Sequence, residues 1–81
     1  MDATRPLDAL NLARNKRVIV ELKNGRRYVG NLKAFDIHIN TVLDEAEEYN
    51  AEGEIQRKLG MVFIRGDTIT LISPQSQISP Q

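Results

Sequence analysis

Asn24-Gly25 lies between two runs of alternating apolar and polar residues, and this pattern constrains the fold more than any other in the chain. Before it, apolar side chains recur at every second position from Val18 to Leu22, and a second run begins near Tyr28. An Asn-Gly pair between two such runs is the strongest short-range signal of a β-hairpin. We therefore predict that the chain is built on an antiparallel sheet.

Further strand-like runs fill most of the remaining sequence. Two strands are expected to meet near Asp36, because apolar runs lie on both sides of it. A glycine inside a strand, such as Gly30, commonly marks a bend or a bulge, which a small sheet needs if it is to curl into a barrel. Fourth and fifth strands are predicted at about residues 55–64 and 68–72, separated by the turn Arg65-Gly66.

A short helix is predicted at the N-terminal end, over about residues 5–14. Thr4 could cap it, Pro6 suits its first turn, and apolar residues follow at helical spacing. Such a helix is too short to be stable alone and must pack on the sheet. Residues 75–81 are predicted to form a disordered tail, so the domain is expected to span residues 1–74, with its strands between about residues 17 and 72.

One helix followed by five strands predicts an all-β fold, a strongly bent five-stranded antiparallel barrel of the SH3-like or OB-like kind. A chain of 81 residues has a limited core, and association is a common way to add buried surface. The chain has no cysteine, which excludes disulfides and thiolate metal sites. No run approaches the roughly 18 apolar residues of a membrane span, so we expect a cytoplasmic protein that does not associate with membranes.

Charge is balanced along the whole chain, with eleven basic and eleven acidic residues. Binding of nucleic acid must therefore depend on where individual charges lie, and not on a general basic field. The acidic residues 44–54 are expected to form a solvated loop that would repel RNA. Six basic residues could form a secondary rim that touches RNA, or could be solvated strand ends: Arg14, Lys16, Arg17, Lys23, Arg26 and Arg27.

Two short polar segments carry the candidate functional residues. In Asp36-Ile37-His38-Ile39-Asn40 a polar residue recurs at every second position, so in a strand the three polar side chains would project from one face. The second segment, Ile64-Arg65-Gly66-Asp67, closes an apolar run. If it folds back beside the first, a flat ring, a flat guanidinium and an amide come together, which is what gripping an unstacked nucleobase requires.

Each segment also has a simpler explanation. A single histidine on a strand is more often a surface residue than a ligand, and Arg65-Gly66-Asp67 alone is a tight turn. Asp36 with His38 could suggest acid–base or metal chemistry, but no second histidine, cysteine or serine nucleophile joins them in a recognisable arrangement. We therefore expect no catalytic residue, no metal site and no cofactor, and we predict that the protein is not an enzyme.

The order of these elements and motifs resembles the Sm-like (Lsm) proteins, in particular their archaeal members. The resemblance covers about residues 4–73, and it depends on the two polar segments at this spacing. The bacterial branch of that family has lysine and histidine where this chain has Arg65-Gly66-Asp67. The resemblance implies the Sm fold and homo-oligomeric rings, usually of seven subunits, in which the fourth strand, near residues 58–64, pairs with the fifth strand of the next subunit, near residues 68–72.

The resemblance also implies roles for single residues, at a central pore that binds short uridine-rich single-stranded RNA. His38 and Arg65 would sandwich the base and Asn40 would read its edge. The supporting residues of the pocket would be Asp36, Gly66 and Asp67. Stacking contributes roughly 1–3 kcal/mol per base whatever its identity. A fixed amide, by contrast, can donate to uracil O4 and accept from N3–H, a pattern that cytosine reverses.

Two functions follow from this interpretation. The first is a ring-shaped RNA-binding protein that acts as a scaffold or chaperone in RNA processing, with RNA-processing proteins as further partners. The alternative is a structural ring adaptor of the same fold that acts mainly through protein partners.

Overall fold

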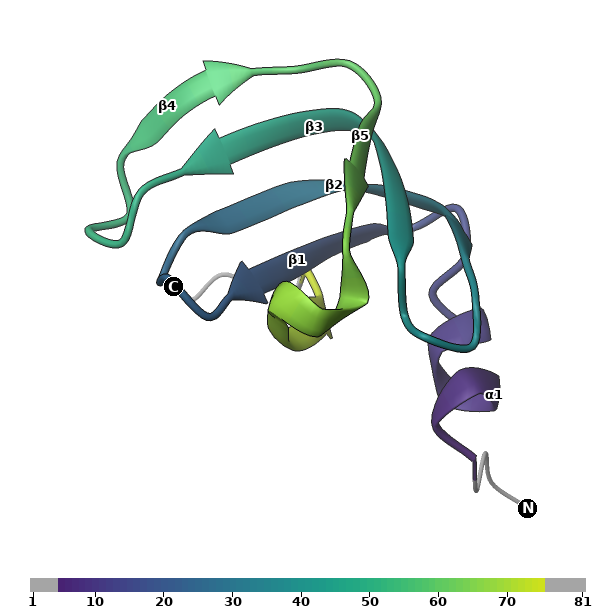
Figure 1. Cartoon of the computed structure of the whole chain (residues 1–81). Coiled ribbons are helices and arrows are strands. Elements are labelled where there is room, and N and C mark those ends of the chain that lie inside the picture. Colours follow the sequence, from purple (N-terminus) through teal and green to yellow (C-terminus); the bar gives the residue numbers. More distant parts are fainter. Residues whose placement is uncertain (1–4, 76–81) are drawn as a thin grey trace.

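A single antiparallel sheet bends strongly over a small core in the computed structural model, which describes residues 5–75 (Figure 1). The elements in chain order are α1 (Pro6–Asn11), β1 (Arg17–Leu22), β2 (Arg27–Phe35), β3 (Thr41–Tyr49), β4 (Ile55–Lys58), β5 (Val62–Ile64), the 3₁₀ turn η1 (Gly66–Thr68) and β6 (Ile69–Pro74). The strand order is β4-β3-β2-β1-β6, with β5 also paired to β3. The predicted all-β class with a short N-terminal helix and a bent sheet is confirmed.

The predicted hairpin is formed by β1 and β2. Gly25 in its turn has a φ of 92°, a conformation that glycine adopts without strain, and the Leu22 N–H donates to the Arg26 carbonyl at 2.8 Å. Along β1 the side chains of Val18 and Val20 are fully buried, and the other four residues of the strand are only half-buried. The alternation in the sequence therefore gives the buried face of this strand.

Gly30 marks a bend, as its place inside a strand predicts. A Cβ at this position would lie 2.9 Å from the Asp44 carbonyl oxygen and 3.2 Å from the Ala46 Cα, so the backbone of β3 passes directly over it. The register of β2 against β3 shifts between Val29 and Asn31 at the same place. The missing side chain lets the two strands approach closely where the sheet curves.

The predicted fourth strand, residues 55–64, is divided into β4 and β5. Between them, the Leu59 N–H donates to the Ala46 carbonyl at 2.7 Å, and the Ala46 N–H donates to the Gly60 carbonyl at 3.1 Å. Glu45 has a φ of 50°, so β3 itself is irregular at this point. The C-terminal part of β3 pairs with β4 and its N-terminal part with β5, and the division follows from the bend of β3.

The prediction that residues 44–54 form a solvated loop is wrong for their first half, which lies in β3. Glu48 is only 1% exposed, and its carboxylate accepts hydrogen bonds from Arg57 Nε at 3.0 Å and from Arg26 Nη1 at 2.6 Å. The hydrogen bond from Arg57, more than the charge of Arg26, holds the pKa of Glu48 below its usual range against the opposing effect of burial. Only residues 50–54, between β3 and β4, form a turn.

The core lies on the concave side of the sheet and is closed by the N-terminal segment. Its buried members are Val18, Val20, Leu32, Leu43, Ala46 and Ile64. Leu10 and Ala13 pack against this cluster, so the short helix is held by tertiary contacts, as expected. The regular helix is shorter than predicted, because the chain continues from Leu12 in tight turns until Asn15, whose φ is 67°. The expected Thr4 cap and residues 76–81 of the expected tail lie outside the part that the structure describes.

Candidate functional site

Asp36 organises the loop of residues 36–40, which joins β2 to β3. Its Oδ1 accepts the backbone N–H groups of His38, at 2.8 Å, and Asn40, at 3.1 Å. Its Oδ2 accepts the side-chain N–H of Asn40 at 3.0 Å. The Asn40 side chain makes the largest contribution to lowering the pKa of Asp36, and the two backbone N–H groups add to it. The carboxylate therefore stays ionised and holds the loop closed.

The expectation that Asp36, His38 and Asn40 share one face of a strand is wrong. Residues 36–40 belong to no strand, and Ile39 has a φ of 63°, which interrupts any extended run. The physical reason is the Asp36 side chain, which bonds to nearby backbone N–H groups and so competes with strand pairing. The three polar residues still meet, but through a turn built around one carboxylate.

The second polar segment folds back on the first, as predicted. The Gly66 N–H donates to Asn40 Oδ1 at 2.8 Å. A Cβ on Gly66 would collide with the His38 carbonyl oxygen and would lie 2.8 Å from the carbonyl carbon of Ile39. Only glycine allows the two segments to come this close.

The side-chain amide of Asn40 is held on both sides. Its Nδ2 donates to the Asp36 carboxylate and its Oδ1 accepts from the Gly66 N–H, so the reverse orientation would place donor against donor and acceptor against acceptor. An Asn amide has two N–H donors and two acceptor lone pairs. One donor and one lone pair therefore remain for a ligand, in a fixed orientation.

Arg65 and Asp67 flank Gly66 in the second polar segment. Arg65 Nη2 is 3.2 Å from Asp67 Oδ2, and both side chains are largely exposed. The Arg65 carbonyl accepts two hydrogen bonds from Thr68, one from its backbone N–H at 3.1 Å and one from its side-chain hydroxyl at 2.7 Å. These two bonds fix the turn that presents the guanidinium.

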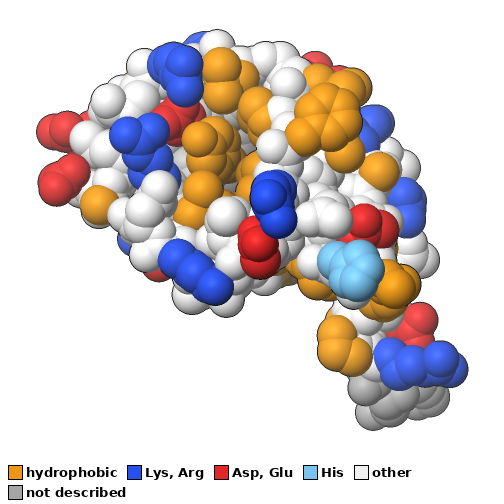
Figure 2. Space-filling view, in the orientation of Figure 1, with side chains coloured by type: hydrophobic (Ala, Val, Ile, Leu, Met, Phe, Trp, Pro, Cys, Tyr) orange, Lys and Arg blue, Asp and Glu red, His pale blue; other side chains and the backbone are white. Residues whose placement is uncertain are grey.

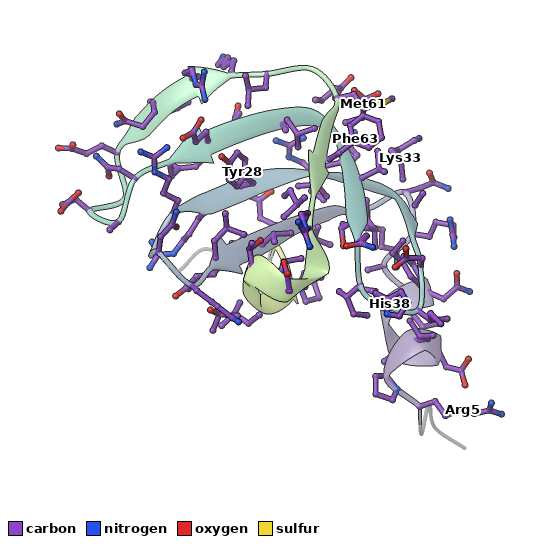
Figure 3. The ribbon with its side chains drawn as sticks, viewed as in Figure 1. Arg5, Tyr28, Lys33, His38, Met61 and Phe63 are labelled. Atoms are coloured by element: carbon purple, nitrogen blue, oxygen red, sulfur yellow. The ribbon has the colours of Figure 1, made fainter. Side chains whose placement is uncertain are left out.

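A pocket of about 400 Å³ lies between these two segments. It is lined by His38, Asn40, Arg65, Gly66 and Asp67. Asp36, the sixth predicted site residue, holds the Asn40 amide from behind. Figure 2 shows the histidine at the surface with charged side chains beside it, and Figure 3 places His38 on the loop between β2 and β3, on the side of α1. The structure therefore brings all six predicted residues together.

The predicted basic rim is reduced by ion pairs within the chain. Three of its six residues lie within 4 Å of a glutamate carboxylate: Arg17 with Glu47, Arg26 with Glu48, and Arg27 with Glu21. Arg14 lies over the ring of Phe35, at 4.9 Å from its centroid. Of the predicted rim, only Arg14, Lys16 and Lys23 have no carboxylate partner within the described range.

The sheet has two free edges within residues 5–75, since β4 and β5 pair only with β3 and β6 pairs only with β1. Large apolar side chains are exposed along both. Phe63 on β5 is 76% exposed and the neighbouring Met61 56%, while Leu71 on β6 is 44% exposed. Figure 3 shows Met61 and Phe63 close together at β5. An open edge with apolar side chains beside it is a surface suited to strand pairing with a second copy.

Sequence reasoning missed one residue of the loop, Ile39, whose left-handed backbone conformation has no signature in the sequence. Within residues 5–75 no group of three His, Asp or Glu side chains is placed to hold a metal ion. None of the helices in the described range is both long and apolar enough to cross a membrane.

Comparison with known protein families gives a match to the LSM domain over residues 8–74. An snRNP Sm-like protein of Methanococcoides burtonii is 56% identical over 70 residues, which cover 86% of this chain and 96% of that protein. A second, from Archaeoglobus fulgidus, is 53% identical over 70 residues, covering 86% and 90% of the two chains.

Solved structures agree with these matches. The Sm protein of Pyrococcus abyssi, determined in complex with a uridine heptamer, superposes with a TM-score of 0.83 at 42% identity, covering 88% of this chain and 99% of that one. A heptameric archaeal Sm protein superposes with a TM-score of 0.77 at 34% identity, covering 84% and 97%.

Proposed function

Because this chain belongs to the LSM family of Sm-like proteins, we propose that it assembles into a ring and binds short uridine-rich single-stranded RNA, as a scaffold or chaperone in RNA processing. Its relative from Pyrococcus abyssi was solved with a uridine heptamer, and another archaeal relative is heptameric. RNA-processing proteins would be its further partners.

The observation that carries this proposal is the fixed amide of Asn40. Asp36 and Gly66 leave it one N–H donor and one acceptor lone pair. Uracil offers the complementary O4 acceptor and N3–H donor. Cytosine offers the opposite pattern and would leave polar groups unpaired, which costs about 1–3 kcal/mol for each buried group.

Stacking supplies affinity in this proposal. The His38 imidazole and the Arg65 guanidinium line the same pocket, and both have flat faces that can pack on a base. The Asp67 carboxylate, 3.2 Å from the Arg65 guanidinium, orients it. Each stacked base would contribute roughly 1–3 kcal/mol with little regard to sequence, so identity depends on Asn40.

A homo-oligomeric ring, in our proposal a heptamer, follows from the two free strand edges. Pairing β5 of one subunit with β6 of the next would cover Phe63 and Leu71 and leave no open edge on either strand. One Arg65 per subunit would then be repeated around a small circle, so that a chain with balanced charge acquires a positive pore.

We assign a binding role and not a catalytic one, because every predicted site residue has a part in the pocket that needs no bond-making chemistry. The absence of cysteine in the sequence fits a reducing compartment, and we place the protein in the cytoplasm.

The test is fluorescence anisotropy of labelled oligouridine and oligocytidine of equal length, at about physiological salt so that phosphate attraction is screened. Wild-type protein should prefer oligouridine. Asn40→Ala should lower oligouridine affinity roughly tenfold and abolish the preference while the ring stays intact. Glu52→Ala, at an exposed residue of the turn between β3 and β4, is the control and should change neither the affinity nor the preference. Equal or absent binding of both RNAs by the wild type would favour the adaptor function instead.

A further inference from the structure

Ile39 has a backbone conformation that suits its side chain poorly. Its φ is 63°, in the left-handed region, where a β-branched side chain is crowded by its own backbone. Within residues 5–75, the other non-glycine residues with positive φ are Asn15 and Glu45, and neither is β-branched. Such strain persists only where the surrounding structure imposes it, and it is concentrated at functional sites.

The backbone of Ile39 is fixed from three directions. Its N–H donates to the Asp36 carbonyl at 2.9 Å, and its carbonyl accepts the hydroxyl of the buried Thr41 at 2.6 Å. Gly66 lies against the same peptide, since a Cβ there would be 2.8 Å from the Ile39 carbonyl carbon. The left-handed turn is therefore part of the contact that brings the two polar segments together.

The side chain of Ile39 lies away from the polar pocket. Ile39 is half-buried and lines an apolar cavity of about 470 Å³ between α1 and β6, together with Leu10, Val18, Ile69 and Ile72. In Figure 1 the loop between β2 and β3 extends to the side of α1. Its neighbours in the chain, His38 and Asn40, are exposed and line the polar pocket.

We propose that Ile39 is a positioning residue for base selection: its apolar side chain, anchored between α1 and β6, holds the left-handed turn that orients His38 and Asn40. The proposal rests on the function proposed above and adds a residue that touches no base. It also links the helix to the pocket, because the cavity that receives Ile39 is lined by α1.

The test compares Ile39→Gly with Ile39→Leu. Glycine adopts a positive φ without strain but has no anchoring side chain, whereas leucine keeps the apolar volume without the β-branch. Circular dichroism and size-exclusion chromatography establish that each variant folds and assembles. Two measurements follow on each ring: the ratio of oligouridine to oligocytidine affinity, and the NMR signals of the Asn40 side-chain NH₂ group in the RNA-free protein.

We expect Ile39→Gly to lower the ratio of oligouridine to oligocytidine affinity by about tenfold. The two Asn40 side-chain proton signals should move towards those of an Asn side chain that has no fixed hydrogen-bond partner. Ile39→Leu should retain the wild-type ratio and signals. An unchanged ratio and unchanged signals in Ile39→Gly would overturn the proposal, and so would a Leu variant as impaired as the Gly variant. If the wild type shows no uridine preference, the proposed function fails, while loosening of the Asn40 amide in Ile39→Gly alone would still support the positioning role.

Discussion

The Gly66 backbone lies directly against the His38 carbonyl, and no side chain fits between the two residues. This contact joins the turn after β5 to the loop after β2, and the 2.8 Å hydrogen bond from the Gly66 N–H to Asn40 Oδ1 depends on it. Glycine at position 66 is thus a condition for the pocket and not merely a turn residue.

Gly66→Ala should therefore separate the two segments and break the hydrogen bond to Asn40. We expect a loss of about 1–3 kcal/mol in the free energy of unfolding, by the usual cost of overpacking, and a loss of uridine preference. Thermal denaturation and anisotropy measure the two effects. Gly60→Ala is the matched control, because a Cβ at Gly60 would meet no atom within 4 Å. Equal effects of both substitutions would contradict this account.

The Asp36 carboxyl should titrate below the usual aspartate range when followed by NMR. The largest cause of the lowered pKa is the hydrogen bond from the Asn40 side chain, so Asn40→Ala should raise it. Because the folded-state pKa is lowered, this group stabilises the fold at pH values above its ordinary pKa of about 3.9, and the contribution is lost as the pH falls through the lowered value. An Asp36 titration that does not respond to Asn40→Ala would show that the amide is not held as described.

Glu48→Gln should reduce stability and alter its dependence on pH. Glutamine keeps the shape but removes the charge that faces Arg26 and Arg57, and we expect a loss of about 1–2 kcal/mol near pH 7. The pKa of Glu48 is lowered in the folded state, so its contribution is present above the ordinary glutamate pKa of about 4.3 and is lost as the pH falls through the lowered folded-state value. Denaturant unfolding over a series of falling pH values from pH 7 should show a difference between wild type and variant that shrinks as the Glu48 carboxylate becomes protonated.

Phe63→Glu should dissociate the ring. It places a charge on the exposed apolar surface of β5, where the proposed neighbouring strand would bury it without a partner. Light scattering coupled to size exclusion should show species smaller than the wild-type assembly, with secondary structure retained by circular dichroism. Leu12→Glu, at a residue that is 69% exposed at the end of α1, should leave assembly unchanged. A Phe63→Glu ring of normal size would place the interface elsewhere.

The features that could be predicted from the sequence depend on neighbouring residues. The Asn24-Gly25 hairpin and the bend at Gly30 follow from local patterns, and the structure confirms both. The six site residues come from two short motifs that the fold brings together, while their part in RNA binding stays a prediction. The roles predicted for these residues in RNA binding come from the resemblance to the Sm-like proteins, because the fold alone does not assign them.

The features that could not be predicted depend on contacts between distant residues. Glu48 is buried because Arg26, from the β1–β2 turn, and Arg57, from β4, converge on its carboxylate, and nothing in an acidic run indicates such partners. The predicted fourth strand is divided because β3 bends beneath it, which a continuous apolar run does not reveal. Residues 36–40 alternate between polar and apolar side chains as a strand does, which is why the sequence predicts a strand there. The left-handed turn of this loop is imposed by contacts with Asp36, Thr41 and Gly66.

The Asn40 side chain is held by two hydrogen bonds within the protein, one to the Asp36 carboxylate and one from the Gly66 N–H. A side chain that is already immobile loses little rotamer freedom on binding, so the entropic cost of recognition at this position is small. The same rigidity means that the amide cannot rotate to suit a different base. In the proposed function this preorganisation serves affinity and discrimination together, and a mismatched nucleotide should leave faster without arriving more slowly.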